Sequence, residues 1–78
     1  MNAEFAELEV VVLTRDLPAE GLVAGDVGTI VYVYDADHYE VEFVTADGTT
    51  VALMTLAAES IRPRSGSEIM HAREVTEP

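Results

Sequence analysis

Residues 27–34 read VGTIVYVY, and residues 39–43 read YEVEF. The first stretch is a continuous run of β-branched and aromatic residues and gives the strongest strand signal in the chain, with both faces expected to be partly covered. The second alternates apolar with acidic residues, which is typical of a half-buried strand that turns Tyr39, Val41 and Phe43 toward a core. With turn residues between them, the two stretches predict neighbouring strands of a β fold.

On the N-terminal side, residues 8–13 (LEVVVL) predict a first strand that ends before Pro18. The segment that follows contains two glycines but also Leu17, Leu22 and Val23. We therefore expect a long structured loop that turns an apolar tip toward the core.

On the C-terminal side, Asp47-Gly48 accepts the positive φ of a tight hairpin, so residues 49–56 are expected to return as a strand. Residues 57–60 are too few for an α-helix between strands and suit one turn of 3₁₀ helix. Residues 61–63 then form a brief closing strand, and Pro63 places it at an edge or an end.

Together these elements predict an all-β fold, a small SH3-like partly open five-stranded barrel with a short 3₁₀ turn before its last strand. The chain of 78 residues has room for one such domain, which we assign to residues 1–64. Residues 65–78 form a C-terminal tail. Ser65 and Glu68 have the spacing of a capping box, so residues 69–75 are candidates for a short helix, with a frayed polar tail as the alternative.

The chain carries 15 acidic and four basic residues, a formal net charge of −11. Such a field repels phosphate backbones and anionic membranes, so we expect neither direct nucleic-acid binding nor membrane binding. The charge either keeps a small apolar domain in solution or forms an acidic face for a basic protein partner. Cysteine, a signal sequence and a long apolar run are all missing from the sequence, which together predict a cytoplasmic protein.

Short motifs follow one another in a distinctive order along the predicted strands and turns. They read Asp16-Leu17-Pro18, Gly21-Leu22, Gly25-Asp26-Val27-Gly28-Thr29, Tyr39-Glu40-Val41-Glu42-Phe43, Asp47-Gly48, Thr55-Leu56 and Ile61-Arg62-Pro63. Over residues 5–63 the chain resembles a family of small bacterial, often cyanobacterial, proteins that is classed as a domain of unknown function and has an SH3-like barrel. The resemblance implies that fold and no particular chemistry. It also implies a context, because small acidic members of such families often look like the antitoxin or immunity half of a gene pair whose other half is a toxin or nuclease.

The sequence lacks the residue constellation of a familiar catalytic, cofactor or metal site, so we expect a protein that is not an enzyme. His38 stands beside carboxylates, yet no serine, cysteine or second histidine lies near it in the sequence. Asp35 and Asp37 begin like a calcium loop but lack its further ligands. Glu40 and Glu42 could pair as in a glycosidase, but so small a barrel offers no deep cleft to raise the pKa of one carboxyl.

The run Gly25-Asp26-x-Gly28-Thr29 has too few glycines and no following lysine for a phosphate-binding loop. We expect Gly25 and Gly28 to allow a turn and a bulge, or a close backbone approach, at a corner of the barrel. Asp26 is expected to accept hydrogen bonds from nearby backbone amides.

Tyr32 and Tyr34 are two residues apart and so share one face of their strand. If that face is open, they form a binding stripe beside acidic residues, like the surface tyrosines through which SH3-like domains bind peptides. Plain core packing is the alternative. The candidate partner-binding residues are Tyr32, Tyr34, Asp35, Asp37, Glu40 and Glu42.

We therefore expect a non-catalytic acidic protein-binding module, of the antitoxin or immunity type, whose partner is a basic toxin or nuclease encoded by an adjacent gene. One alternative is a nucleic-acid-associated regulatory module of the transcription-factor barrel type, in which only Arg15, Arg62, Arg64 and Arg73 could contact phosphate. The other is an accessory subunit of an enzyme. Self-association through a strand edge or the C-terminal segment is also expected, because small open barrels leave strand edges unpaired.

Overall fold

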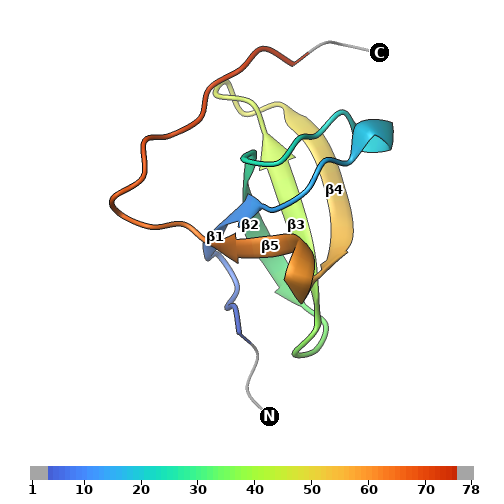
Figure 1. The fold of residues 1–78 in the computed structure, drawn as a ribbon. Helices are drawn as coiled ribbons and strands as arrows, with labels where there is room; N and C mark the ends of the chain where they lie inside the picture. Colours follow the sequence, from blue (N-terminus) through green and yellow to red (C-terminus); the bar gives the residue numbers. More distant parts are fainter. Residues whose placement is uncertain (1–3, 76–78) are drawn as a thin grey trace.

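The computed structural model describes residues 4–75. The first three residues of the predicted domain (1–3) and the last three of the predicted tail (76–78) lie outside the described residues. Five strands and two 3₁₀ turns follow one another along the chain (Figure 1). They are β1 (Val10–Leu13), η1 (Pro18–Glu20), β2 (Val27–Val33), β3 (His38–Val44), β4 (Thr50–Ala57), η2 (Ala58–Ser60) and β5 (Ile61–Pro63). The predicted all-β fold with five short strands and a 3₁₀ turn before the last one is confirmed.

All five strands form one antiparallel sheet in the order β4-β3-β2-β1-β5. The sheet stays open between β4 and β5, which are its two edge strands. The turn η2 leads the chain from one edge strand directly into the other (Figure 1). Pro63 lies in β5 and therefore at an edge, where its missing N–H interrupts no central ladder.

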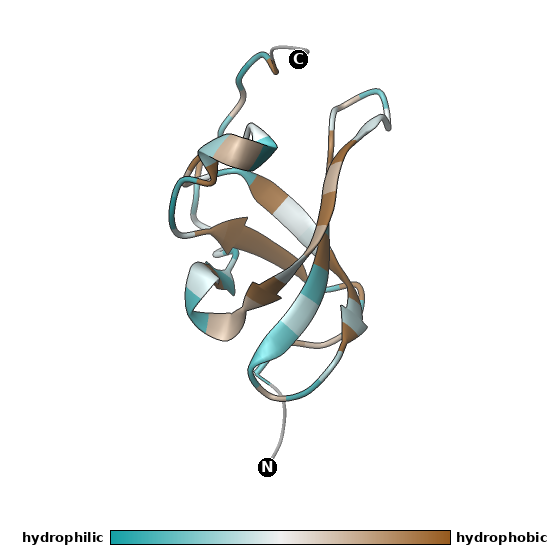
Figure 2. Cartoon of the chain, turned by 90° about the vertical axis from the view of Figure 1, so that its right-hand side faces the viewer, coloured by the Kyte–Doolittle hydropathy of each residue, from teal (hydrophilic) through white to brown (hydrophobic). Residues whose placement is uncertain are grey.

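One face of the sheet carries the hydrophobic core, and Figure 2 shows strongly hydrophobic residues concentrated along the strands. Tyr39 is the largest fully buried side chain, as predicted for the inward face of β3. Its hydroxyl oxygen accepts hydrogen bonds from the N–H groups of Glu4 (3.0 Å) and Phe5 (3.4 Å) and donates one to the carbonyl of Ala36 (2.9 Å). The ring of Phe5 packs edge-on against it at 5.2 Å, so Tyr39 ties the segment before β1 to the core.

The loop between β1 and β2 turns an apolar tip inward, as predicted. Leu22 is buried, and its backbone pairs with that of Leu17 to close the loop at its base. Gly21 between them has φ of +73°, a conformation that favours glycine.

The bulge expected at Gly28 is absent from that position, and the close-approach alternative is the correct one. A Cβ atom on Gly28 would lie 2.7 Å from the side chain of Val41 and 2.8 Å from that of Phe43. The register irregularity of β2 lies instead between Ile30 and Tyr32.

This bulge decides which way the tyrosines of β2 point. Ile30 faces the core opposite Val41, so strict alternation would also turn Tyr32 and Tyr34 inward. The extra residue shifts the pattern by one, so that Tyr32 pairs with Glu40 on the outer face. Core packing, the alternative for the two tyrosines, is therefore wrong.

The predicted tail contains no helix within its described part, residues 65–75. The capping-box contact itself forms, since the Glu68 carboxylate accepts the N–H of Ser65 at 2.5 Å. The chain nevertheless runs on in an irregular, extended path, because so short a segment gains too little from helical hydrogen bonds and finds its contacts elsewhere. Across residues 4–75, no helix is long and apolar enough to cross a membrane.

Candidate functional site

The outer face of β2, β3 and β4 brings together four of the six predicted binding residues. Tyr32 pairs with Glu40 across β2 and β3, and Glu40 pairs in turn with Thr55 of β4. Glu42 lies two residues after Glu40 in β3, and Tyr34 follows the end of β2 directly with its hydroxyl bonded to Glu40. We call this surface the tyrosine face, and it consists of Tyr32, Tyr34, Glu40, Glu42, Thr50, Leu53 and Thr55.

Three large apolar side chains of the tyrosine face are exposed to solvent. Tyr32 is 52% exposed, Tyr34 is 53% exposed and Leu53 is 56% exposed. The two tyrosine rings pack edge to face with their centroids 4.9 Å apart, which restricts both side chains before any partner arrives. Such rigid amphipathic anchors are typical of protein-binding surfaces.

Hydrogen bonds hold both carboxylates of the face in place. Glu40 Oε1 accepts the hydroxyl of Tyr34 at 3.0 Å and that of Thr55 at 2.8 Å. Glu42 Oε2 accepts the hydroxyl of Thr50 at 2.8 Å. With Glu40 and Glu42 about 7 Å apart along β3, the face presents two oriented negative charges beside the tyrosine pair.

The other two predicted residues, Asp35 and Asp37, lie in the turn between β2 and β3, and a hydrogen bond between them stabilises that turn. The Asp35 carboxylate accepts the N–H of Asp37 at 2.8 Å and lies 3.0 Å from Nδ1 of His38. These contacts, the Asp37 N–H first and His38 second, lower the pKa of Asp35. His38, the first residue of β3, is therefore an exposed residue paired with a carboxylate.

Sequence reasoning missed the part of the tyrosine face that β4 contributes. Leu53 lies opposite Glu42 and points outward, although the sequence around it reads as apolar on both faces of the strand. No periodic signal separates Leu53 from its buried neighbours Ala52 and Leu56. Only the pairing of Leu53 with Glu42 of β3 shows that its side chain lies on the outer face of the sheet.

A second arrangement surrounds Asp26, which is 9% exposed and directly precedes β2. Its carboxylate accepts the N–H of Val23 at 2.9 Å, which confirms the expected contact with a nearby backbone amide. It also accepts two hydrogen bonds from Arg73 of the tail, from Nε at 2.8 Å and from Nη2 at 2.6 Å. Burial by itself raises the pKa of Asp26, but the hydrogen bonds of Arg73 and Val23 and the nearby positive charge outweigh it and lower the pKa.

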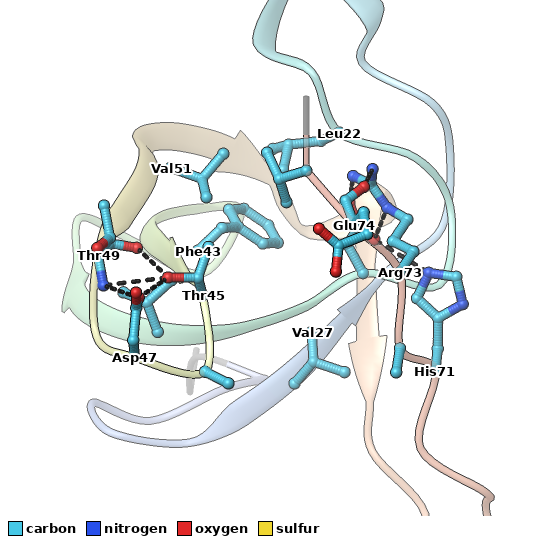
Figure 3. Close-up of a pocket in the computed structure, with 15 residues that line it drawn as sticks. Leu22, Val27, Phe43, Thr45, Asp47, Thr49, Val51, His71, Arg73 and Glu74 are labelled. Carbon is cyan, nitrogen blue, oxygen red and sulfur yellow. Dashed lines mark hydrogen bonds and ion pairs between the residues drawn. The ribbon is translucent and has the colours of Figure 1, made fainter. Parts of the chain in front are cut away.

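A cleft of about 590 Å³ opens beside this ion pair. Figure 3 shows Arg73 and His71 at one end, the turn of Thr45 to Thr49 at the other, and the apolar side chains of Phe43 and Leu22 between them. His71 Nε2 lies 3.2 Å from the Asp26 carboxylate. The pairing of Asp26 with Arg73 was not predicted, because the two residues are 47 positions apart and carry no local pattern that links them.

Neither arrangement resembles a metal centre. Within residues 4–75, no group of three or more histidine, cysteine, aspartate or glutamate side chains is placed to hold a metal ion.

Comparison with known proteins identifies the domain but not its activity. Neither the curated proteins nor the solved structures include a match to the chain. The model of one family, described as "Domain of unknown function (DUF4926)", matches residues 7–63, a range that spans all five strands and the loop that carries Asp26. The chain therefore belongs to the DUF4926 family.

Proposed function

We propose that the chain is a non-catalytic module that binds a basic protein through the tyrosine face. The observation that carries this proposal is the packed pair Tyr32 and Tyr34, half exposed beside the oriented carboxylates of Glu40 and Glu42. Aromatic rings at the surface are attractive contacts for the apolar stems and charged heads of lysine and arginine. The carboxylates then pair with the same cations.

The charge distribution supports a basic partner. The chain has a net charge of −11, and most of its few arginines are occupied within the molecule. Arg62 pairs with Glu68, Arg73 pairs with Asp26, and Arg15 donates to the hydroxyl of Ser60. Complementary charge accelerates encounter with a basic protein and disfavours phosphate backbones, so a nucleic-acid-associated role has less support.

The biological role that we propose is neutralisation of a toxin or nuclease. Proteins that act on nucleic acids need a basic site to hold phosphates, and a small domain of strong negative charge is suited to cover such a site. The partner would be encoded by an adjacent gene. An accessory role in an enzyme is the alternative, and no contact among the described residues favours it.

The test is affinity capture with the full chain as bait. The tagged chain is incubated with host extract at about 0.15 M salt, close to physiological ionic strength, and retained proteins are identified by mass spectrometry. We expect one basic protein in stoichiometric amount, whose expression alone stops growth and whose co-expression with the chain restores it. Titration calorimetry of the purified pair then gives the dissociation constant.

A matched pair of variants ties the result to the tyrosine face. Tyr32→Ala combined with Leu53→Ser should raise the dissociation constant by roughly tenfold or more, as expected for loss of central aromatic and apolar contacts. Ile69→Ser removes an apolar residue of the tail that is 97% exposed, and it should leave the dissociation constant unchanged. Equal loss in both variants, or capture of an acidic protein, would contradict the proposal.

A further inference from the structure

The described end of the tail forms one wall of the cleft, and residues of the family domain form the rest. After β5 the chain arcs away from the sheet and returns over the β3–β4 hairpin (Figure 1). Residues 71–75 then line the cleft together with Leu22, Phe43 and Val51. These side chains give the cleft an apolar floor beside the buried carboxylate of Asp26.

The contacts of Arg73 are specific for a guanidinium group. Nε and Nη2 donate to the two oxygens of Asp26, and Nη2 also donates to the carbonyl of Gly21 at 2.9 Å. A planar fork of donors can satisfy this bidentate arrangement and the third acceptor at once. A lysine ammonium is a point charge and cannot reproduce it.

The acceptor side of this contact is organised without the tail. The Val23 N–H donates to Asp26 Oδ2, the Asp26 N–H donates to the Val23 carbonyl, and the Asp26 carbonyl accepts the N–H of Leu13. All of these residues lie within the range 7–63 that matches the family, whereas Arg73 lies outside it. The family domain therefore presents an oriented carboxylate beside the Gly21 carbonyl, an acceptor set that suits a guanidinium group from this chain or from a partner.

We propose that the Asp26 end of this cleft is a second binding site, which takes an arginine-bearing extended segment of a partner protein, and that Arg73 of the tail occupies this end as an internal competitor. The covalent connection through residues 64–72 holds Arg73 near Asp26 at a high effective concentration. A partner segment must displace the tail before it binds. The tail therefore sets a threshold of affinity or concentration below which Asp26 stays paired with Arg73.

The probe is a capped peptide with the sequence of residues 69–75, titrated into the full ¹⁵N-labelled chain and followed by NMR. The variant Arg73→Gln frees the Asp26 carboxylate from Arg73 without shortening the chain. We expect it to bind the peptide roughly tenfold more tightly than the unmodified chain does, because its own tail no longer competes. Shifts should be confined to amides around the cleft, such as Leu22, Val23 and Thr45, and should spare Tyr32 and Tyr34.

Two controls test the chemistry of the site. A peptide with lysine in place of its arginine should bind at least several-fold more weakly to Arg73→Gln, because it loses the bidentate contact. Adding Asp26→Asn to Arg73→Gln should abolish binding, and the comparison of peptides decides the matter even if that double variant fails to fold.

Three results would overturn the inference. The first is equal binding of the peptide by the unmodified chain and by Arg73→Gln. The second is equal binding of the arginine and lysine peptides. The third is a dimer of the unmodified chain, measured by light scattering, that Arg73→Gln converts to a monomer, because the occupant would then be a second copy. Failure of the tyrosine face to bind a basic protein would leave these measurements unaffected. Peptide binding at the cleft is followed by the amide signals of residues around the cleft, and these are different from the signals of the tyrosine face.

Discussion

At the scale of the residue, Gly28 shows how closely β3 side chains approach the backbone of β2. The space that a Cβ atom would need is filled by Val41 and Phe43, both fully or almost fully buried. Neither neighbour can move freely, because both are packed into the centre of the core.

Gly28→Ala should therefore lower the free energy of unfolding by about 1–3 kcal/mol, the usual cost of an extra carbon in a packed core. Gly66→Ala is the matched control, since nothing lies within 4 Å of its would-be Cβ. Urea denaturation of both variants gives the comparison. A Gly28→Ala chain as stable as the control would mean that β2 and β3 separate at little cost.

At the scale of the element, the joint between β5 and the tail is held by Glu68. Arg62 donates to both oxygens of its carboxylate, at 3.0 and 2.6 Å, and the Ser65 N–H donates to one of them. The capping-box spacing thus closes a turn directly after β5 and begins no helix. From this turn the tail starts its path toward the cleft.

We expect the side-chain carboxyl of Glu68 to titrate far below the ordinary value of 4.5. The hydrogen bonds from Arg62 and then from Ser65, with smaller charge effects, lower its pKa to about 2. Any stabilisation from this joint is present above the ordinary value and is lost as the pH falls toward 2, because the folded chain holds the charged form. NMR titration of the carboxyl carbon measures the midpoint directly.

Arg62→Gln should raise that midpoint markedly, whereas Arg64→Gln should raise it only slightly, because Arg64 contributes charge alone. Equal midpoints in the two variants would show that the Arg62 contact does not persist in solution.

At the scale of the whole molecule, charge opposes compactness. Fifteen acidic residues face four basic ones on a chain of 78 residues, so the folded state brings like charges together. The ion pairs Arg62–Glu68 and Arg73–Asp26 offset only part of this repulsion.

Screening should therefore raise the melting temperature. Sodium chloride at about 0.5 M shortens the Debye length to a few ångströms, which suppresses repulsion between surface charges more than it weakens the partly buried Arg73–Asp26 pair. Differential scanning calorimetry between about 0.02 M and 0.5 M salt follows the change. A melting temperature that falls with salt would mean that attractive pairs outweigh the excess negative charge.

The sequence by itself determined the strands, the Asp47-Gly48 turn, the 3₁₀ turn before β5 and the inward side chains of β3. Each of these depends on alternation or backbone preference within a few neighbouring residues. It also placed Tyr32 and Tyr34 on one face of their strand and Glu40 and Glu42 on one face of theirs, because residues two apart share a face.

Only the tertiary structure decided that this surface is open. One extra residue between Ile30 and Tyr32 turns the tyrosines outward, and strand propensity gives no sign of where such a bulge forms. The contact of Arg73 with Asp26 joins positions 47 residues apart. This contact depends on how the folded sheet positions the β1–β2 loop and the tail relative to each other. No local sequence pattern predicts that arrangement.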